Sequence, residues 1–103
     1  ILDDLMNKFK NIQEIRLEID KIDLKILDLI SARKDLVTNV VKFKNRNQIT
    51  DKKRIDEILN RLDDEAKQRK ISQSLIRDLW NIMIKSFISY EEEIFDKTDD
   101  KKS

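Results

Sequence analysis

An arginine occupies a position where the pattern of the first half of the chain requires an aliphatic residue. Apolar residues recur there in alternating steps of three and four, at Ile12, Ile15, Ile19, Ile22, Ile26, Leu29, Leu36, Val40 and Phe43. The step of four after Leu29 falls on Arg33. Such a rhythm marks the buried face of a helix, and a buried charge that loses its partner costs roughly 3–5 kcal/mol. We therefore expect an anion, from the protein or from a ligand, to meet Arg33.

Two further charged residues are placed to join this arginine. Lys44 follows Arg33 by eleven residues. On a helix this separation leaves the two side chains about 20° apart in direction and about 16 Å apart along the axis. Glu91 fills the gap in a second three-four rhythm, whose other members are Trp80, Met83, Phe87 and Ile94. Lys44 and Glu91 are therefore both predicted to point inward.

Three more charged residues extend the set of candidates. Asp51 precedes Arg54 by three residues at the expected start of a helix, where it can orient the guanidinium as an i, i+3 pair. Arg16 lies seventeen residues before Arg33, which places it some 100° away around a helix. Arg16 thus points away from its own chain's site, but in an antiparallel dimer it could reach the partner's site.

The charge of this set separates two interpretations. Arg33 and Glu91 alone would be explained as buried structural ions, and Lys44, Arg54 and Arg16 alone would be ordinary solvated charges. Together, however, the candidates carry more positive than negative charge. That excess favours a small dianionic ligand, ideally a dicarboxylate held by the forked donors of arginine.

The composition limits the chemistry that the chain can perform. Its 103 residues include no Cys and no His, which removes the thiolate nucleophile, the usual general base and the commonest metal ligands. We therefore expect neither a metal nor a cofactor. The 22 basic and 21 acidic side chains leave a net charge of +1, which attracts nucleic acid or an anionic membrane only weakly.

Two partner classes are therefore disfavoured. A nucleic-acid role could rest only on the short cluster Lys52-Lys53-Arg54 and is the weakest interpretation. No apolar run approaches the roughly 20 residues needed to cross a bilayer, so we expect no membrane association and a cytoplasmic location.

The absence of Gly and Pro removes the usual turn chemistry and favours an all-α fold. We predict a single domain over residues 1–103 with three helices, one long and two shorter. The first helix runs from about Ile12 to residues 43–45, and helical spacing of apolar residues allows it to extend over residues 1–11.

The second and third helices are indicated by caps and by their own apolar faces. Thr50 or Asp51 is a suitable N-cap for the second helix, and cations at residues 67–70 suit its C-terminus. Its apolar face consists of Ile55, Ile58, Leu59, Leu62 and Ala66. Ser72 is predicted to cap the third helix, and residues 97–103 are expected to form a frayed tail. The inward residues of the third helix are Leu75, Ile76, Leu79, Trp80, Met83, Ile84, Phe87, Ile88, Ile94 and Phe95.

The length of the first helix predicts a partner. At ~1.5 Å per residue, its 30 or more residues span about 45–50 Å. A compact chain of this size is only some thirty-five Å wide, from a radius of gyration of about 13 Å. Two shorter helices cannot cover the whole apolar seam, so we expect an intertwined homodimer in which the first helices pack on each other.

The sequence resembles that of a known protein family. The stretch from Ile15 to Asp23, residues 27–33 and Phe43-Lys44 are similar to the first helix of the all-helical (type II) chorismate mutases. The same fold includes the isochorismate-pyruvate lyases. The resemblance covers about residues 12–95 and extends through Asp51 and Trp80. It rests on an ordered set, namely Arg16, Asp23, Arg33, Lys44, Arg54 and a polar residue at position 91.

The resemblance implies an intertwined three-helix dimer with two sites and a role for each candidate. Arg33 and Arg16 of the other chain would hold the two carboxylates of chorismate. Lys44 would donate to the enolpyruvyl ether oxygen, Arg54 would help to close the site and bind a carboxylate, and Asp51 would contact the ring hydroxyl. A Claisen rearrangement needs a folded substrate and donors placed where charge develops, so the absence of His and Cys is no obstacle.

Two positions depart from the family pattern. Ile55 stands where mutases usually have a glutamate that contacts the ring hydroxyl, whereas the lyases tend to have an aliphatic residue there. Glu91 stands where many members have glutamine. Donation to the ether oxygen from Glu91 requires the protonated carboxyl, which burial favours. We also expect Ile55 and Phe87 to contact the substrate.

The residues and their resemblance to this family are compatible with three functions. We predict a chorismate mutase, because this is the commoner activity of the fold. An isochorismate-pyruvate lyase, which forms salicylate and pyruvate, is the alternative that Ile55 favours. A non-catalytic helical dimerisation module is the alternative from another class, and it predicts that Arg33→Ala has no ligand-dependent effect.

Overall fold

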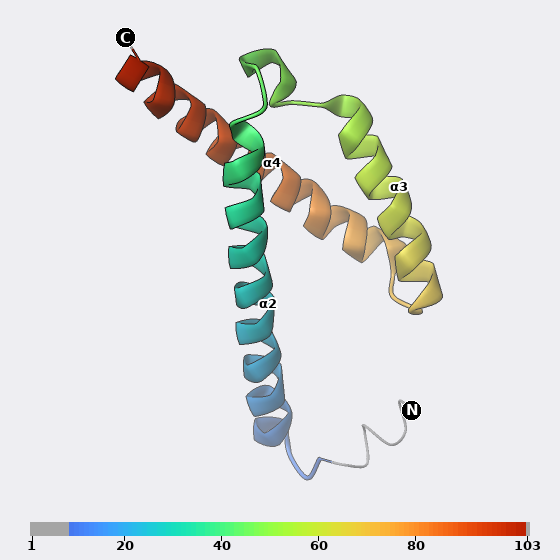
Figure 1. The fold of residues 1–103 in the computed structure, drawn as a ribbon. Helices are drawn as coiled ribbons and strands as arrows, with labels where there is room; N and C mark the ends of the chain where they lie inside the picture. The colour runs from blue at the N-terminus through green and yellow to red at the C-terminus, as the bar shows by residue number, and fades with distance from the viewer. Residues whose placement is uncertain (1–8, 103) are drawn as a thin grey trace. The chain divides into compact units, whose positions relative to one another are not determined.

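The structure is a computed structural model that describes residues 9–102, with side chains described through residue 98. It contains three α-helices, and no strand occurs within the described residues. In chain order the elements are α2 (Ile12–Val41), the short 3-10 helix η1 (Arg46–Gln48), α3 (Lys52–Gln68) and α4 (Gln73–Lys102) (Figure 1). The predicted all-α class is confirmed. The chain forms two compact units, Ile1–Asp35 and Leu36–Ser103.

The start of α2 is fixed by a reciprocal cap. The Asn11 Oδ1 accepts a hydrogen bond from the Glu14 backbone N–H at 3.0 Å, and the Glu14 carboxylate accepts one from the Lys10 N–H at 2.9 Å. These bonds satisfy N–H groups that have no partner within the helix. The helix therefore begins at Ile12, as expected. Residues 9–11 are not helical, and the rest of the extension considered above, residues 1–8, lies outside the described residues.

The end of α2 differs from the prediction. The helix ends at Val41 instead of residues 43–45. Beyond it, Lys42, Phe43 and Lys44 donate their backbone N–H groups to carbonyls three residues earlier, with distances of 2.9–3.2 Å. Such bonds tighten the last turn and rotate the following side chains away from the α-helical face. As a result Phe43, expected in the buried seam, is 87% exposed.

The third helix was predicted to be shorter than the first, but α4 has 30 residues, as many as α2. Both α3 and α4 begin at side-chain caps. Of the two candidates for α3, the cap is Asp51, whose Oδ1 accepts the Arg54 backbone N–H at 3.1 Å. The predicted cap of α4 is also confirmed, because Ser72 Oγ accepts the Leu75 N–H at 3.2 Å. At its far end, α4 continues to Lys102 and includes the stretch expected to fray from residue 97. No Gly or Pro interrupts that charged stretch, so nothing in its residue types stops the helix.

The turn between α3 and α4 uses a lysine where glycine is usual. The N–H of Ile71 donates to the carbonyl of Ala66 at 2.9 Å, and the N–H of Lys70 donates to the carbonyl of Lys67 at 3.1 Å. This pair of bonds is the Schellman ending of a helix, which needs a left-handed residue. Lys70 supplies it with φ of 57°. The predicted cationic C-terminus also takes part, since the Arg69 guanidinium donates to the Glu65 carbonyl at 3.1 Å.

The α3–α4 hairpin carries most of the small core. Its buried apolar residues are Leu59, Ala66 and Ile84, and Val41 and Ile49 are also buried in the same unit. Two residues predicted to face inward, Leu75 and Leu79, are instead 53% and 50% exposed. Within residues 9–102, no helix combines the length and apolarity needed to cross a membrane.

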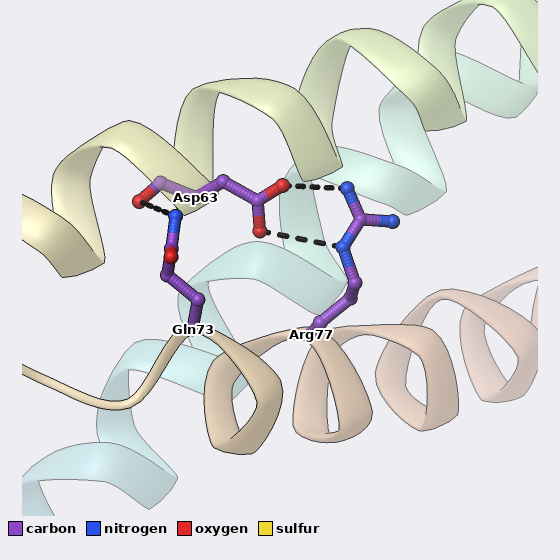
Figure 2. Close-up of polar contacts among 3 residues, drawn as sticks. All are labelled: Asp63, Gln73 and Arg77. Carbon is purple, nitrogen blue, oxygen red and sulfur yellow. Dashed lines mark hydrogen bonds and ion pairs between the residues drawn. The ribbon is translucent and has the colours of Figure 1, made fainter.

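A polar fork ties the two arms of the hairpin together (Figure 2). The Asp63 carboxylate of α3 accepts two bonds from the Arg77 guanidinium of α4, at 2.6 and 3.3 Å. The backbone carbonyl of Asp63 also accepts a bond from Gln73 Nε2 at 3.2 Å. The hydrogen bond from Arg77 to Asp63 and the negative charge of that carboxylate raise the pKa of Arg77. This bidentate geometry fixes the register of α4 on α3.

Candidate functional site

Two of the predicted site residues contact each other. Lys44 Nζ donates to the Glu91 Oε1 at 3.0 Å. The side chain of Glu91 is only 8% exposed and that of Lys44 24% exposed. Lys44 lies in the turn that follows α2, whereas Glu91 lies in α4, 47 residues later. The structure therefore places an ammonium donor against a buried carboxyl group, where the surroundings strengthen electrostatic interactions.

A hydroxyl pair holds the same two elements together. Thr38 Oγ1 and the Tyr90 hydroxyl are 3.1 Å apart, and either can donate. The Tyr90 ring meets that of Phe87 edge-on, with centroids 6.3 Å apart and an interplanar angle of 87°. Phe87, a predicted substrate contact, is half-buried in this arrangement. The last turns of α2 and the middle of α4 are thus joined by neighbouring polar pairs.

A cavity of about 360 Å³ opens beside Lys44. It is lined by Thr38, Val41, Lys42, Lys44, Asn45, Ile94, Phe95 and Thr98. The lining combines two cationic side chains, hydroxyls and an amide with aliphatic and aromatic groups, and it includes no carboxylate. Small-molecule sites have this mixed character and comparable volumes. Of the predicted site residues, Lys44 alone lines this cavity, and its ammonium bonds to Glu91.

The start of α3 differs in detail from the expectation. The Asp51 carboxylate was expected to orient the Arg54 side chain, but it accepts the Arg54 backbone N–H instead. The reason is that the first N–H groups of a helix lack intrahelical partners and attract a nearby carboxylate. The Arg54 guanidinium is exposed and lies 3.7 Å from Glu57. Ile55, the next residue, is half-buried.

The two remaining predicted residues lie on α2 in the N-terminal unit. Arg33 is half-buried, whereas Arg16 is exposed. Both belong to one continuous helix, so seventeen residues separate them by about 25 Å along its axis. One small dicarboxylate cannot bridge that distance. Within a single chain, Arg16 and Arg33 therefore cannot hold the same ligand.

Several interactions were not predicted from the sequence, including the Thr38–Tyr90 pair. The Arg46 guanidinium lies over the Phe95 ring at 4.9 Å and forms an ion pair with Asp96. The Asp63–Arg77 fork was likewise not predicted. Both join residues that are far apart in the sequence, and no periodic pattern marks them. Among the described residues, no cluster of three or more His, Cys, Asp or Glu side chains is arranged to hold a metal ion.

Comparison with known proteins adds two findings. Residues 15–92, more than half of the chain, match the family described as chorismate mutase type II. The chain is also similar to a protein named chorismate mutase from Methanocaldococcus jannaschii. The two are 29% identical over 94 residues, which cover 89% of this chain and 95% of the archaeal protein. The family match includes the positions of all eight predicted site residues, from Arg16 to Glu91.

Proposed function

Because the chain belongs to the type II chorismate mutase family, we propose that it converts chorismate to prephenate. The observation that carries this proposal is the Lys44–Glu91 contact of 3.0 Å. These are the two residues to which the family resemblance assigns the ether oxygen. The similarity to an archaeal protein named chorismate mutase supports the same substrate.

The reaction is an intramolecular rearrangement, in which one C–O bond breaks while one C–C bond forms and no atom is gained or lost. Catalysis therefore consists of folding the substrate and stabilising charge on the ether oxygen. Lys44 donates one hydrogen bond to that oxygen. Glu91 donates a second when its carboxyl group carries a proton. Lys44 Nζ and Glu91 Oε1 lie 3.0 Å apart, which is close enough for both groups to reach one substrate oxygen.

Arginines hold the two carboxylates. Arg33 binds one of them from the half-buried face of α2 through a forked pair of N–H donors. Arg16 of the other chain binds at the same site, because the two arginines of one chain lie about 25 Å apart along the helix. Arg54 is exposed and closes over the substrate, exchanging its contact with Glu57 for a substrate carboxylate.

The remaining positions shape the site. Asp51 keeps one carboxylate oxygen on the helix N-terminus and offers the other to the ring hydroxyl. Ile55 and Phe87 supply apolar contacts to the ring. Ile55 provides no hydrogen-bond partner for that hydroxyl, so Asp51 carries more of the recognition than in a family member with glutamate at this position.

The proposal requires a homodimer, and the exposed face of α2 supports one. The predicted seam is at least 40% exposed at each of Ile12, Ile15, Ile19, Ile22, Ile26 and Leu29. A single chain would leave this apolar stripe in water, at a cost of about 25 cal/mol for each Å². A second copy that packs its own α2 there removes the cost and brings Arg16 across. Light scattering at micromolar concentration should give the mass of two chains, and a monomeric mass would contradict this part of the proposal.

The activity is tested by NMR observation of products from chorismate and, separately, from isochorismate. Prephenate from chorismate as the faster reaction would support the mutase. Faster release of salicylate and pyruvate from isochorismate would make the chain a lyase, with Ile55 as the residue that explains it. Lys44→Met should abolish most of the turnover, while Lys85→Met, on the exposed part of α4, should leave it unchanged. No turnover of either substrate would refute an enzymatic function.

A further inference from the structure

The turn that carries Lys44 is attached to α4 at a second point, through Arg46. This arginine is the first residue of η1 and lies two residues after Lys44. Its guanidinium forms an ion pair with Asp96 and covers the Phe95 ring at 4.9 Å from the centroid. A guanidinium can do both at once, because its planar face stacks on a ring while its edge donates to a carboxylate.

The two attachments lie on the same part of α4. Glu91, which binds Lys44, precedes Phe95 by four residues and Asp96 by five. On a helix this spacing amounts to slightly more than one turn, or about 6–7.5 Å. Lys44 and Arg46 therefore contact α4 at two adjacent points, and together they determine how the backbone between them lies on the helix.

The local structure of η1 makes Arg46 a rigid connection. Asn45 donates its backbone N–H to the Gln48 side chain at 2.7 Å, and Gln48 N–H donates to the Asn45 carbonyl at 2.9 Å. These bonds close a single short turn around Arg46. On the other side, the N–H of Lys44 bonds to the Val41 carbonyl at 3.2 Å. The backbone of Lys44 is thus held between the end of α2 and the anchored η1.

A long side chain needs such a fixed base. Lysine loses considerable rotamer freedom when its ammonium is fixed, and a small displacement of a positioned catalytic group reduces rates strongly. We propose that Arg46 is a positioning residue, which sets the place of the Lys44 ammonium through its contacts with Phe95 and Asp96. The kinetic consequence rests on the proposed mutase function, whereas the structural consequence does not.

The competing explanation is that other contacts hold the turn. Ile49 is only 4% exposed and anchors the chain just after η1, and ion pairs as exposed as Arg46–Asp96 are often weak. Under that explanation, the loss of Arg46 would leave the Lys44 ammonium where it is. The two explanations therefore differ in what happens at Lys44, not in what happens to overall stability.

The first test follows the Lys44 side chain by NMR in the ligand-free protein. The Nζ signal of Lys44 is assigned by its loss in Lys44→Met. In Arg46→Ala this signal should shift or broaden, because the Glu91 contact loosens, and Arg46→Lys should restore most of it, since a lysine can still pair with Asp96. The matched control is Arg69→Ala, which removes another exposed arginine with an ion pair, to Glu65. An unchanged Lys44 signal in Arg46→Ala would overturn the proposal.

The second test is a double-mutant cycle on turnover of chorismate. Arg46→Ala should lower kcat about tenfold and change KM less, while Arg69→Ala changes neither. In the Lys44→Met background, Arg46→Ala should cause little additional loss, because the arginine acts through the lysine. Equal losses in both backgrounds would overturn the positioning role. If the parent protein does not turn over chorismate, the proposed function fails, and the NMR signal alone decides the role of Arg46.

Discussion

The α3–α4 hairpin and the N-terminal part of α2 differ in how many of their polar groups and apolar side chains find partners within one chain. The hairpin has a cap at each helix start, a Schellman turn and the Asp63–Arg77 fork, so its polar groups find partners within it. The α2 segment has a capped start, but its apolar seam is largely exposed. Local polar bonds complete the first region, whereas the apolar seam of the second stays exposed in one chain, as the proposed dimer requires.

Under the proposed dimer, this difference separates residues that act within their own chain from residues that act on the partner. The hairpin and the adjoining turn present Lys44 and Glu91 already in contact. The α2 segment presents Arg33 and Arg16 about 25 Å apart along the helix. We therefore expect substitutions in the C-terminal unit to act within their own chain. Substitutions in the N-terminal part of α2 should have effects that depend on the partner.

The largest expected effect follows from replacement of Arg33. Arg33→Leu continues the apolar rhythm of α2 and removes the bond to a substrate carboxylate. We expect kcat/KM for chorismate to fall roughly 100-fold or more, while the chain still unfolds in one cooperative thermal transition. Steady-state kinetics and thermal melting measure the two effects, with Lys25→Leu as control. Retained activity with a lowered Tm would instead make Arg33 a structural ion.

Complementation between two variant chains tests whether α2 contributes Arg16 to the site of the partner chain. Arg16→Ala and Arg33→Ala are each expected to be nearly inactive. If each site uses one arginine from each chain, a heterodimer of the two variants has one intact site and one doubly altered site. After unfolding and refolding of an equimolar mixture, about a quarter of the parent activity should return, as expected for random twofold pairing. A mixture as inactive as its components would show that both arginines act within one chain or that no dimer forms.

A smaller effect is expected at Glu91, in the region that is complete within one chain. Glu91 accepts a hydrogen bond from Lys44, so only a protonated carboxyl group could also donate to the ether oxygen. Glu91→Gln supplies an amide N–H donor in its place, and we expect kcat to be kept or raised because that donor stabilises the developing charge. The exposed neighbour Glu92 provides the control, since Glu92→Gln should leave kcat unchanged. A strong loss of kcat in Glu91→Gln would reject a donor role at this position.

The smallest effect concerns the turn of the hairpin. Lys70 has φ of 57°, a conformation that costs a residue with a Cβ about 1–2 kcal/mol and costs glycine almost nothing. Allowing for the greater freedom of glycine in the unfolded chain, we expect Lys70→Gly to raise the free energy of unfolding by about 0.5–1 kcal/mol. Lys67→Gly, inside α3, should lower it by about 1 kcal/mol. Urea unfolding at one fixed protein concentration compares the two, and destabilisation by Lys70→Gly would contradict this interpretation.

The sequence predicted those features that depend on neighbouring residues. Periodicity located three helices, and hydroxyl or carboxylate side chains located the caps at Asp51 and Ser72, because these interactions involve residues three or four positions apart. The apolar periodicity gave a wrong prediction where the backbone hydrogen bonding changes from α-helical to 3-10 type within one turn. Phe43 continues the apolar rhythm of α2, but the last turn closes with bonds to the third preceding residue, and the side chain is exposed.

The sequence predicted that Lys44 and Glu91 both point inward, but not that they contact each other. Glu91 was singled out as a charge at an apolar position and Lys44 by its direction relative to Arg33, and the two lie together in the structure. Arg77 and Asp63 occupy ordinary polar positions, so their meeting depends on the geometry of the turn between them. Arg46 was missed for the same reason, because its place over Phe95 follows from the conformation of η1.

The uninterrupted helix from Ile12 to Val41 has a consequence for how such a chain can evolve in length. Insertion of one residue between Arg16 and Arg33 would turn one arginine by about 100° relative to the other and lengthen the helix by about 1.5 Å. An insertion of seven residues nearly restores the direction but separates the arginines by about 10 Å more. In an assembly where each chain reaches into its neighbour's site, both sites would lose their alignment at once. In the proposed dimer the segment would therefore set the distance between two active sites, and its length should tolerate insertions far less well than the turns at either end of α3.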